Sequence, residues 1–114
     1  MTLSDFLESN DLIQISTVSK LIITKRDKSN AEVILNLEDK EKISTFLHEF
    51  SIIENDAKFI TMMVPSYDLI LETADFNSLI IGVLPEVKSF RIPNQDTDTE
   101  FEQDFLIIQK KYFN

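Results

Sequence analysis

The chain of 114 residues contains no cysteine, no tryptophan, one histidine and one glycine. Without cysteine it forms no disulfide framework and has no thiolate to serve as a nucleophile. The sole glycine, Gly82, excludes the glycine-rich loops that hold phosphates in nucleotide-binding folds. The sole histidine, His48, leaves no second His or Cys for a zinc site of the usual kind. We therefore expect neither a metal nor a cofactor.

Basic residues are also scarce, since 11 Lys and Arg stand against 20 Asp and Glu and the formal net charge is −9. A protein that coats duplex nucleic acid needs cationic side chains to neutralise the phosphates. We therefore expect no nucleic-acid partner. An acidic surface instead speeds and selects association with a basic protein.

Long hydrophobic runs are missing as well. Apolar stretches such as Leu21–Ile23 and Leu79–Leu84 fall far short of the roughly 18 residues that a membrane-spanning helix needs. The N-terminal residues include no basic segment of the kind that opens a secretion signal. We expect a cytoplasmic protein that does not enter membranes. With 43% hydrophobic and 27% charged residues, its composition is that of one globular domain covering residues 1–114.

The first half of the chain alternates short helical and extended patterns. Ser4–Asn10 is predicted to be a short helix that Ser4 caps. Val18–Arg26 and Ala31–Leu37 are predicted strands. The second alternates with a period of two, which places Val33, Leu35 and Leu37 on one face and Glu32, Ile34 and Asn36 on the other. Lys40–Phe50 is a predicted helix, because its apolar residues recur at helical spacing at Ile43, Phe46, Leu47 and Phe50.

The second half is richer in strands. After a loop, predicted strands cover Lys58–Val64, Tyr67–Thr73, Ser78–Leu84 and, more weakly, Glu86–Ile92. The short turns between them imply antiparallel neighbours, since parallel strands need crossovers of about a dozen residues. Thr99–Phe113 is predicted to form the last helix, with aromatic and aliphatic residues along one side.

The predicted order is therefore α-ββ-α-ββββ-α, which defines an α+β fold with one antiparallel sheet. We expect the two longer helices to pack on one face of this sheet. In a single-layer antiparallel sheet the face away from the helices is usually polar, but here that face carries several isoleucines. Two interpretations remain open: the N-terminal helix covers that face, or the face is an exposed patch that binds a protein partner.

Five of the nine residues from Asp96 to Asp104 are acidic and none is basic. Three hypotheses compete for this segment. The pattern D-x-D-x-E resembles the start of a calcium-binding loop, but Phe101 stands where such loops have glycine. Alternatively, Thr99 and Glu102 form a capping box at the start of the last helix, where acids also complement the helix dipole. The third hypothesis is a docking surface for a basic partner.

The sequence contains few residues that could support catalysis. His48 lies off the apolar side of its predicted helix, so we expect a solvated residue and not a general base. The serines show no G-x-S-x-G motif. Acids are plentiful enough for a carboxylate pair, but a domain this small without tryptophan or glycine-rich loops offers little room for a sugar cleft.

We therefore expect a non-catalytic, acidic protein-binding domain, for example an inhibitor or immunity-type protein that neutralises a basic partner. One alternative is a structural subunit, a homodimer joined through its sheet. Another is a small-ligand-binding domain or a minimal carboxylate enzyme. The residues expected to bind the basic partner are acids in or beside predicted turns: Asp96, Asp98, Glu54, Asp56, Glu72 and Asp75.

Overall fold

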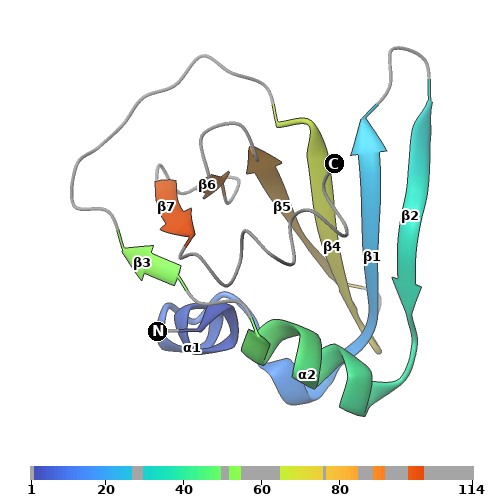
Figure 1. Ribbon diagram of the computed structural model, residues 1–114. Helices are drawn as coiled ribbons and strands as arrows, with labels where there is room; N and C mark the ends of the chain where they lie inside the picture. Colours follow the sequence, from blue (N-terminus) through green and yellow to red (C-terminus); the bar gives the residue numbers. More distant parts are fainter. Residues whose placement is uncertain are drawn as a thin grey trace.

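The computed structural model describes residues 2–26, 30–49, 52–54, 65–75, 77–84, 89–91 and 98–101. Within these residues the chain forms helices α1 (Leu3–Ser9) and α2 (Lys40–Glu49), a 3-10 turn η1 (Ile15–Thr17) and a seven-stranded sheet (Figure 1). The strands are β1 (Val18–Arg26), β2 (Ala31–Leu37), β3 (Ile52–Glu54), β4 (Tyr67–Thr73), β5 (Ser78–Leu84), β6 (Ser89–Arg91) and β7 (Asp98–Phe101).

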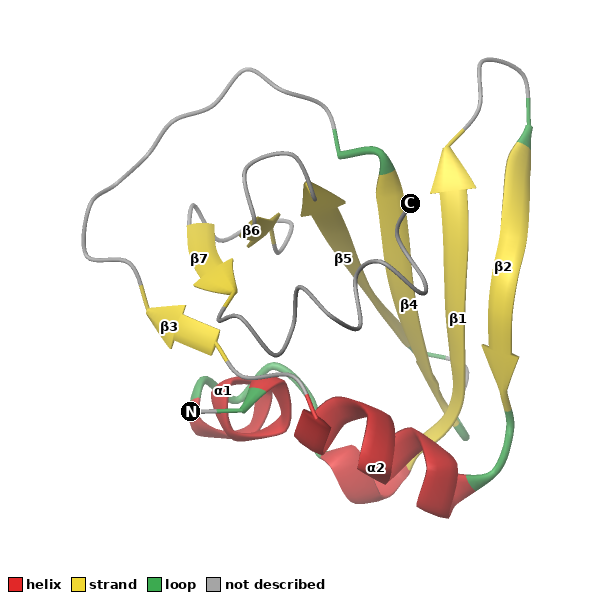
Figure 2. Cartoon of the chain, in the orientation of Figure 1, coloured by secondary structure: helices red, strands yellow, loops and turns green. Residues whose placement is uncertain are grey.

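The sheet has the order β2-β1-β4-β5-β6-β7-β3 in the described part of the chain, and every neighbouring pair is antiparallel (Figure 2). The α+β class with an antiparallel sheet is confirmed. Strands β1, β2, β4 and β5 have the predicted bounds. Their alternating or β-branched segments and the polar turns between them are local signals, which is why the sequence predicts them well.

Two short strands change the predicted order after α2. Strand β3 lies in a segment predicted to be a loop, and β6 occupies only Ser89–Arg91 of the predicted strand Glu86–Ile92. The predicted strand Lys58–Val64 lies outside the described residues. Both short strands are held by pairing with β7, which comes later in the chain. Three-residue strands of this kind are defined by their neighbours and have little sequence pattern of their own.

The predicted last helix is wrong at its start. Residues Asp98–Phe101 form β7, which pairs with β6 on one side and with β3 on the other. Thr99 lies in the extended ladder opposite Phe90 and Glu54, so it cannot begin a helix there as the capping-box hypothesis requires. The ladder bonds to two neighbouring strands outweigh a local cap. The rest of the predicted helix, residues 102–113, lies outside the described residues.

Both described helices contribute to one hydrophobic core. Leu3, Phe6 and Leu7 of α1 pack in the same cluster as Ile43 and Leu47 of α2. The cluster continues on the sheet through alternate residues, which define its inner face: Leu21, Ile23, Tyr67, Leu69, Leu71, Ile81 and Val83. The helices lie next to each other beside the sheet (Figure 1). The prediction that the N-terminal helix covers the second, isoleucine-bearing face is therefore wrong.

The two ends of α1 use different capping devices. Thr2, and not Ser4, is the cap: its Oγ1 accepts a hydrogen bond from Asp5 N (3.2 Å), and Asp5 Oδ2 accepts one from Thr2 N (3.3 Å). At the other end Asp11 adopts a left-handed backbone with φ 54°. Asp11 N then donates to Glu8 O (3.1 Å) and Leu12 N to Leu7 O (2.9 Å), the pattern of a Schellman motif. The chain therefore turns back sharply after α1.

Among the described helices, none has the length and apolar character that crossing a membrane requires.

Candidate functional site

Of the six predicted acids, the four that the structure describes lie at two separate places on the sheet. Glu54 and Asp98 lie on neighbouring strands β3 and β7, whereas Asp56 and Asp96 lie outside the described residues. Glu72 and Asp75 lie elsewhere, at the end of β4 and in the turn that leads to β5. The sequence correctly shows many acids but cannot show which of them meet in space.

Around Glu72 the sheet presents a second face opposite the inner one. Glu72 is half-buried on β4, between Lys20 of β1 and Ser78 of β5 in the strand register. Lys20 in turn reaches Glu38 at an Nζ–Oε1 distance of 3.7 Å. This polar row marks one end of the second face.

Next to it runs an apolar row. Ile22, Ile70 and Ile80 are register partners across β1, β4 and β5, and we call them the isoleucine row. Ile22 and Ile70 are half-buried, while Ile80 is 43% exposed. Neither described helix packs on this row, because α1 and α2 belong to the core on the inner face. Apolar side chains that stay partly exposed on a sheet face are a feature of protein-binding surfaces.

On the edge strand β2 the register partner of Ile22 is Asn36, and the register becomes irregular a step farther along. Ile23 pairs with Leu35 but Thr24 pairs with Val33, so Ile34 is an extra residue, a β-bulge. The bulge breaks the predicted alternation, which placed Val33 and Leu35 on one face. Leu35 stays half-buried against the core, whereas Val33 is 60% exposed. The bulge thereby adds apolar surface at the sheet edge.

Asp75 is fixed by hydrogen bonds within its own turn. Its carboxylate accepts hydrogen bonds from the Thr73 hydroxyl and from Asn77 Nδ2, the latter at 3.1 Å. Thr73 N also donates to Asn77 O at 2.9 Å, which closes the turn. The bond from Thr73, followed by bonds from backbone amides and Asn77, holds the pKa of Asp75 below its ordinary value. The side chain is exposed and carries its negative charge at neutral pH.

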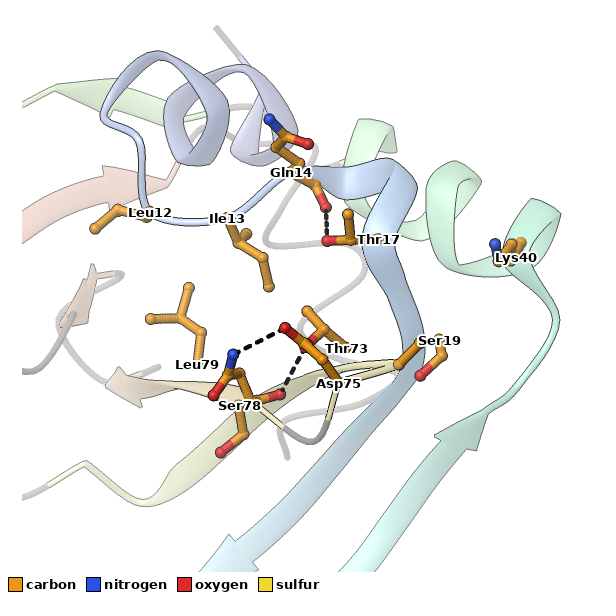
Figure 3. Close-up of a pocket in the computed structure, with 12 residues that line it drawn as sticks. Leu12, Ile13, Gln14, Thr17, Ser19, Lys40, Thr73, Asp75, Ser78 and Leu79 are labelled. Atoms are coloured by element: carbon orange, nitrogen blue, oxygen red, sulfur yellow. Dashed lines mark hydrogen bonds between the residues drawn. The ribbon is translucent and has the colours of Figure 1, made fainter.

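A pocket of about 530 Å³ lies beside this turn. Leu12 and Ile13, from the loop after α1, and Leu79 of β5 form its apolar part (Figure 3). Asp75 and Lys40 place opposite charges among its lining residues. Volumes of this size are common for sites that hold a small molecule or a side chain of a partner. The segment containing Leu12 and Ile13 shows no clear pattern in the sequence, so the pocket could not be predicted.

Ser4 and His48 form a contact between the two helices. Ser4 Oγ lies 2.5 Å from His48 Nδ1 and 3.0 Å from Thr2 Oγ1. Ser4 is only 1% exposed, so a substrate cannot reach its hydroxyl. His48 is exposed, as expected, but it has this specific partner. The pair therefore joins α1 to α2 and does not have the access that a catalytic serine needs.

A further group of acids lies on the helices and was missed in the sequence. Asp5 and Glu8 of α1, Asp11 after it, and Glu41 and Glu49 of α2 are all exposed. Glu8 and Glu41 line the same surface cleft. A signal was present, because no lysine or arginine precedes Lys20 in the chain. These acids extend the negative field beyond the residues that we expected.

Among the residues that the structure describes, no group of three or more acidic or histidine side chains is arranged to hold a metal ion. No protein-family model, no curated protein and no solved structure matches the chain.

Proposed function

We propose that this chain is a non-catalytic protein-binding domain whose partner is a basic protein. The isoleucine row, which lies on the face opposite both described helices, carries the proposal. Burying an isoleucine side chain fully contributes about 1.5–3 kcal/mol. Ile80 is 43% exposed, so a partner that covers it would bury a substantial apolar area. Val33 and Ile34 of β2 are further exposed apolar side chains at the edge of the sheet.

The acids provide the preference for a basic partner. Glu72 borders the isoleucine row, and Asp75 follows in the next turn. Together with the exposed acids of α1 and α2, they give the surface a negative field that accords with the net charge of −9. Such a field raises the rate of encounter with a cationic protein and disfavours acidic competitors.

In its most specific form, this proposal describes an inhibitor or immunity-type protein that covers a basic toxin in the cytoplasm. The absence of cysteine accords with a reducing compartment. Glu72 and Asp75 are the expected contacts that lie near the isoleucine row. Glu54 and Asp98 lie on the β3–β7 pair, apart from the isoleucine row, and would form a second acidic contact with the same partner.

The test is capture of binding proteins from the organism that encodes the chain, followed by calorimetry with the purified partner. Wild type is compared with Ile80→Glu, which replaces an exposed apolar side chain by a charge, and with the control Thr45→Glu, which introduces the same charge at an exposed position of α2. We expect a partner with excess Lys and Arg, at least tenfold weaker binding to Ile80→Glu, and little change with the control. Binding should also weaken about tenfold between 50 and 300 mM salt.

Several outcomes would contradict this proposal. Binding that is independent of salt would remove the electrostatic part, and binding unaffected by Ile80→Glu would remove the isoleucine row. Light scattering could instead show a dimer of this chain that Ile80→Glu dissociates. In that case the row joins two copies, and the chain is the structural subunit considered as the alternative.

A further inference from the structure

We propose that the pocket bordered by Ile13, Leu79 and Asp75 receives an apolar side chain of the basic partner, with a neighbouring Arg or Lys of that partner on Asp75. This inference rests on the proposed function and specifies the peptide chemistry that the domain recognises. The pocket lies at the start of β5, close along the chain to the isoleucine row. Leu79 lines the pocket and packs against the core on the inner face, whereas its neighbour Ile80 belongs to the row on the second face, because successive residues of a strand point to opposite faces.

The apolar part of the pocket is suited to a single aliphatic side chain. Leu12, Ile13 and Leu79 are half-buried and pack against the hydrophobic core on their inner sides. Their remaining exposed surface faces the pocket, where Leu12 and Ile13 approach from the loop and Leu79 from the strand (Figure 3). An inserted Leu or Ile would thus lose its water on several sides at once.

The two charges of the pocket give the bound segment a direction. Asp75 lies in the turn after β4, and Lys40 lies at the first position of α2. A cationic residue of the partner is attracted by the carboxylate of Asp75 and repelled by the ammonium group of Lys40. It should therefore flank the apolar residue on one side only. An acidic residue at that position would meet the carboxylate of Asp75 and bind poorly.

The carboxylate of Asp75 is already held in place before a partner arrives. The Thr73 hydroxyl and Asn77 Nδ2 fix both of its oxygens, and the backbone bond from Thr73 N to Asn77 O closes the turn. On the opposite wall the Thr17 hydroxyl donates to Gln14 O at 2.6 Å, which ties the loop together (Figure 3). A site fixed in this way loses little conformational entropy on binding.

The test is an NMR titration of the ¹⁵N-labelled full chain with the capped tetrapeptide acetyl-Gly-Arg-Leu-Gly-amide at millimolar concentration. We expect saturable shifts at the amides of Ile13, Asp75 and Leu79. Acetyl-Gly-Arg-Gly-Gly-amide lacks the apolar side chain and should bind at least fivefold more weakly. Acetyl-Gly-Glu-Leu-Gly-amide, with the opposite charge, should also bind at least fivefold more weakly.

Two variants assign the binding to the pocket. Asp75→Asn removes the charge and keeps one oxygen for the Thr73 hydroxyl, but it loses the bond that Asn77 Nδ2 donates to the other oxygen. It should weaken the first peptide about threefold. Ile13→Ser removes part of the apolar wall and should weaken it about tenfold. Glu49→Gln, an exposed acid of α2 outside this pocket, is the matched control and should leave the affinity unchanged. If Ile13→Ser does not fold, the peptide controls and Asp75→Asn still show whether the peptide binds in the pocket.

Equal shifts from all three peptides, or shifts that fall away from the pocket residues, would overturn the inference. That result would leave the proposed function standing if the purified basic partner still binds through Ile80. Loss of partner binding in Asp75→Asn and Ile13→Ser as well as in Ile80→Glu would show that one partner uses both surfaces. A partner that ignores Ile80→Glu but responds to the pocket variants would support the pocket and overturn the role of the row.

Discussion

Ser4 Oγ of α1 and His48 Nδ1 of α2 lie 2.5 Å apart, and this hydrogen bond links the two helices that build the core. A serine–histidine contact is also the beginning of a nucleophilic site. Here the serine is 1% exposed, and its hydroxyl is shared with Thr2 Oγ1. The geometry therefore supports a structural bond between helices rather than catalysis.

Removing this bond should cost stability and nothing else. A double-mutant cycle of Ser4→Ala and His48→Ala is expected to give a coupling energy of about 1 kcal/mol, the usual net contribution of an internal hydrogen bond. Urea unfolding at pH 7 measures it. A fluorophosphonate probe, which reacts with activated serines, should leave the native protein unlabelled. Labelling of Ser4 in wild type but not in His48→Ala would show that the pair is catalytic after all.

Arg26 and Asp68 form a second, better-exposed bond across β1 and β4. Arg26 Nε and Nη2 donate to the two carboxylate oxygens, both at 2.8 Å, and the side chains are 41% and 15% exposed. We expect Arg26→Lys, which loses the two-pronged geometry, to lower the free energy of unfolding by about 0.5–1 kcal/mol. The matched comparison is Lys20→Gln, because the Lys20–Glu38 pair is longer at 3.7 Å and Glu38 is 71% exposed.

In that comparison Lys20→Gln should change the unfolding free energy by less than about 0.5 kcal/mol. The difference between the two variants should shrink in 1 M NaCl, since part of the Arg26 contribution is a screened charge interaction. Equal effects of the two substitutions would indicate that the two-pronged geometry adds nothing measurable.

Asp11 supplies a third prediction, in the stabilising direction. Its φ of 54° lies in the left-handed region, which is unfavourable for a residue with a β-carbon. Asp11→Gly should therefore stabilise the protein by about 0.5–1 kcal/mol, less the extra entropy of glycine in the unfolded chain. A rise in the urea midpoint measures this gain.

The control for that variant is the preceding residue. Asn10 has φ −101°, and its Nδ2 donates to Phe6 O at 2.8 Å. Asn10→Gly loses this bond and gains no conformational relief, so it should lower the midpoint. If both glycine variants shift the midpoint in the same direction, the left-handed backbone of Asp11 is not what limits stability.

The sequence predicts the long elements well because their signals are local. Strands β1, β2, β4 and β5 begin and end where alternating or β-branched residues and turn residues indicate. β3 and β7 lack such local signals. Ile52–Glu54 pairs with β7, and Asp98–Phe101 pairs with both β3 and β6, so both segments become strands through their pairing partners. A helix start at Thr99 was the better local solution, and the tertiary pairing replaced it.

The candidate site was predictable in character but not in position. The acid count and the isoleucines of the second face are visible in the sequence, and both reappear as exposed features. Which acids lie near the isoleucine row depends on strand register, and a single bulge at Ile34 moves Val33 to the other face. The pocket depends on Leu12 and Ile13, whose segment has no periodic pattern.

Asp75 gives the protein a pH-dependent contribution to stability. Its pKa is lowered in the folded state, chiefly by the hydrogen bond from Thr73, so the carboxylate stabilises the fold above its unfolded pKa of about 4. As the pH falls through the folded pKa, this contribution is lost. Asp75→Asn should therefore be less stable than wild type at pH 7, and the gap should narrow steadily as the pH falls below about 4. Urea midpoints between pH 7 and pH 2.5 test it, and a gap that does not narrow would assign the effect to shape instead of charge.

The bulge at Ile34 leads to the last prediction, because β2 is an edge strand of the described sheet. Unpaired edge strands invite pairing with another copy, and a bulge is one of the devices that prevents it. Deleting Ile34 would let Val33 and Leu35 follow each other in a regular ladder opposite Thr24 and Ile23. We expect this deletion to increase dimerisation or aggregation in light scattering, whereas Ile34→Ala, which keeps the extra residue, should not. If Ile34→Ala associates as strongly as the deletion, the backbone irregularity is not what protects the edge.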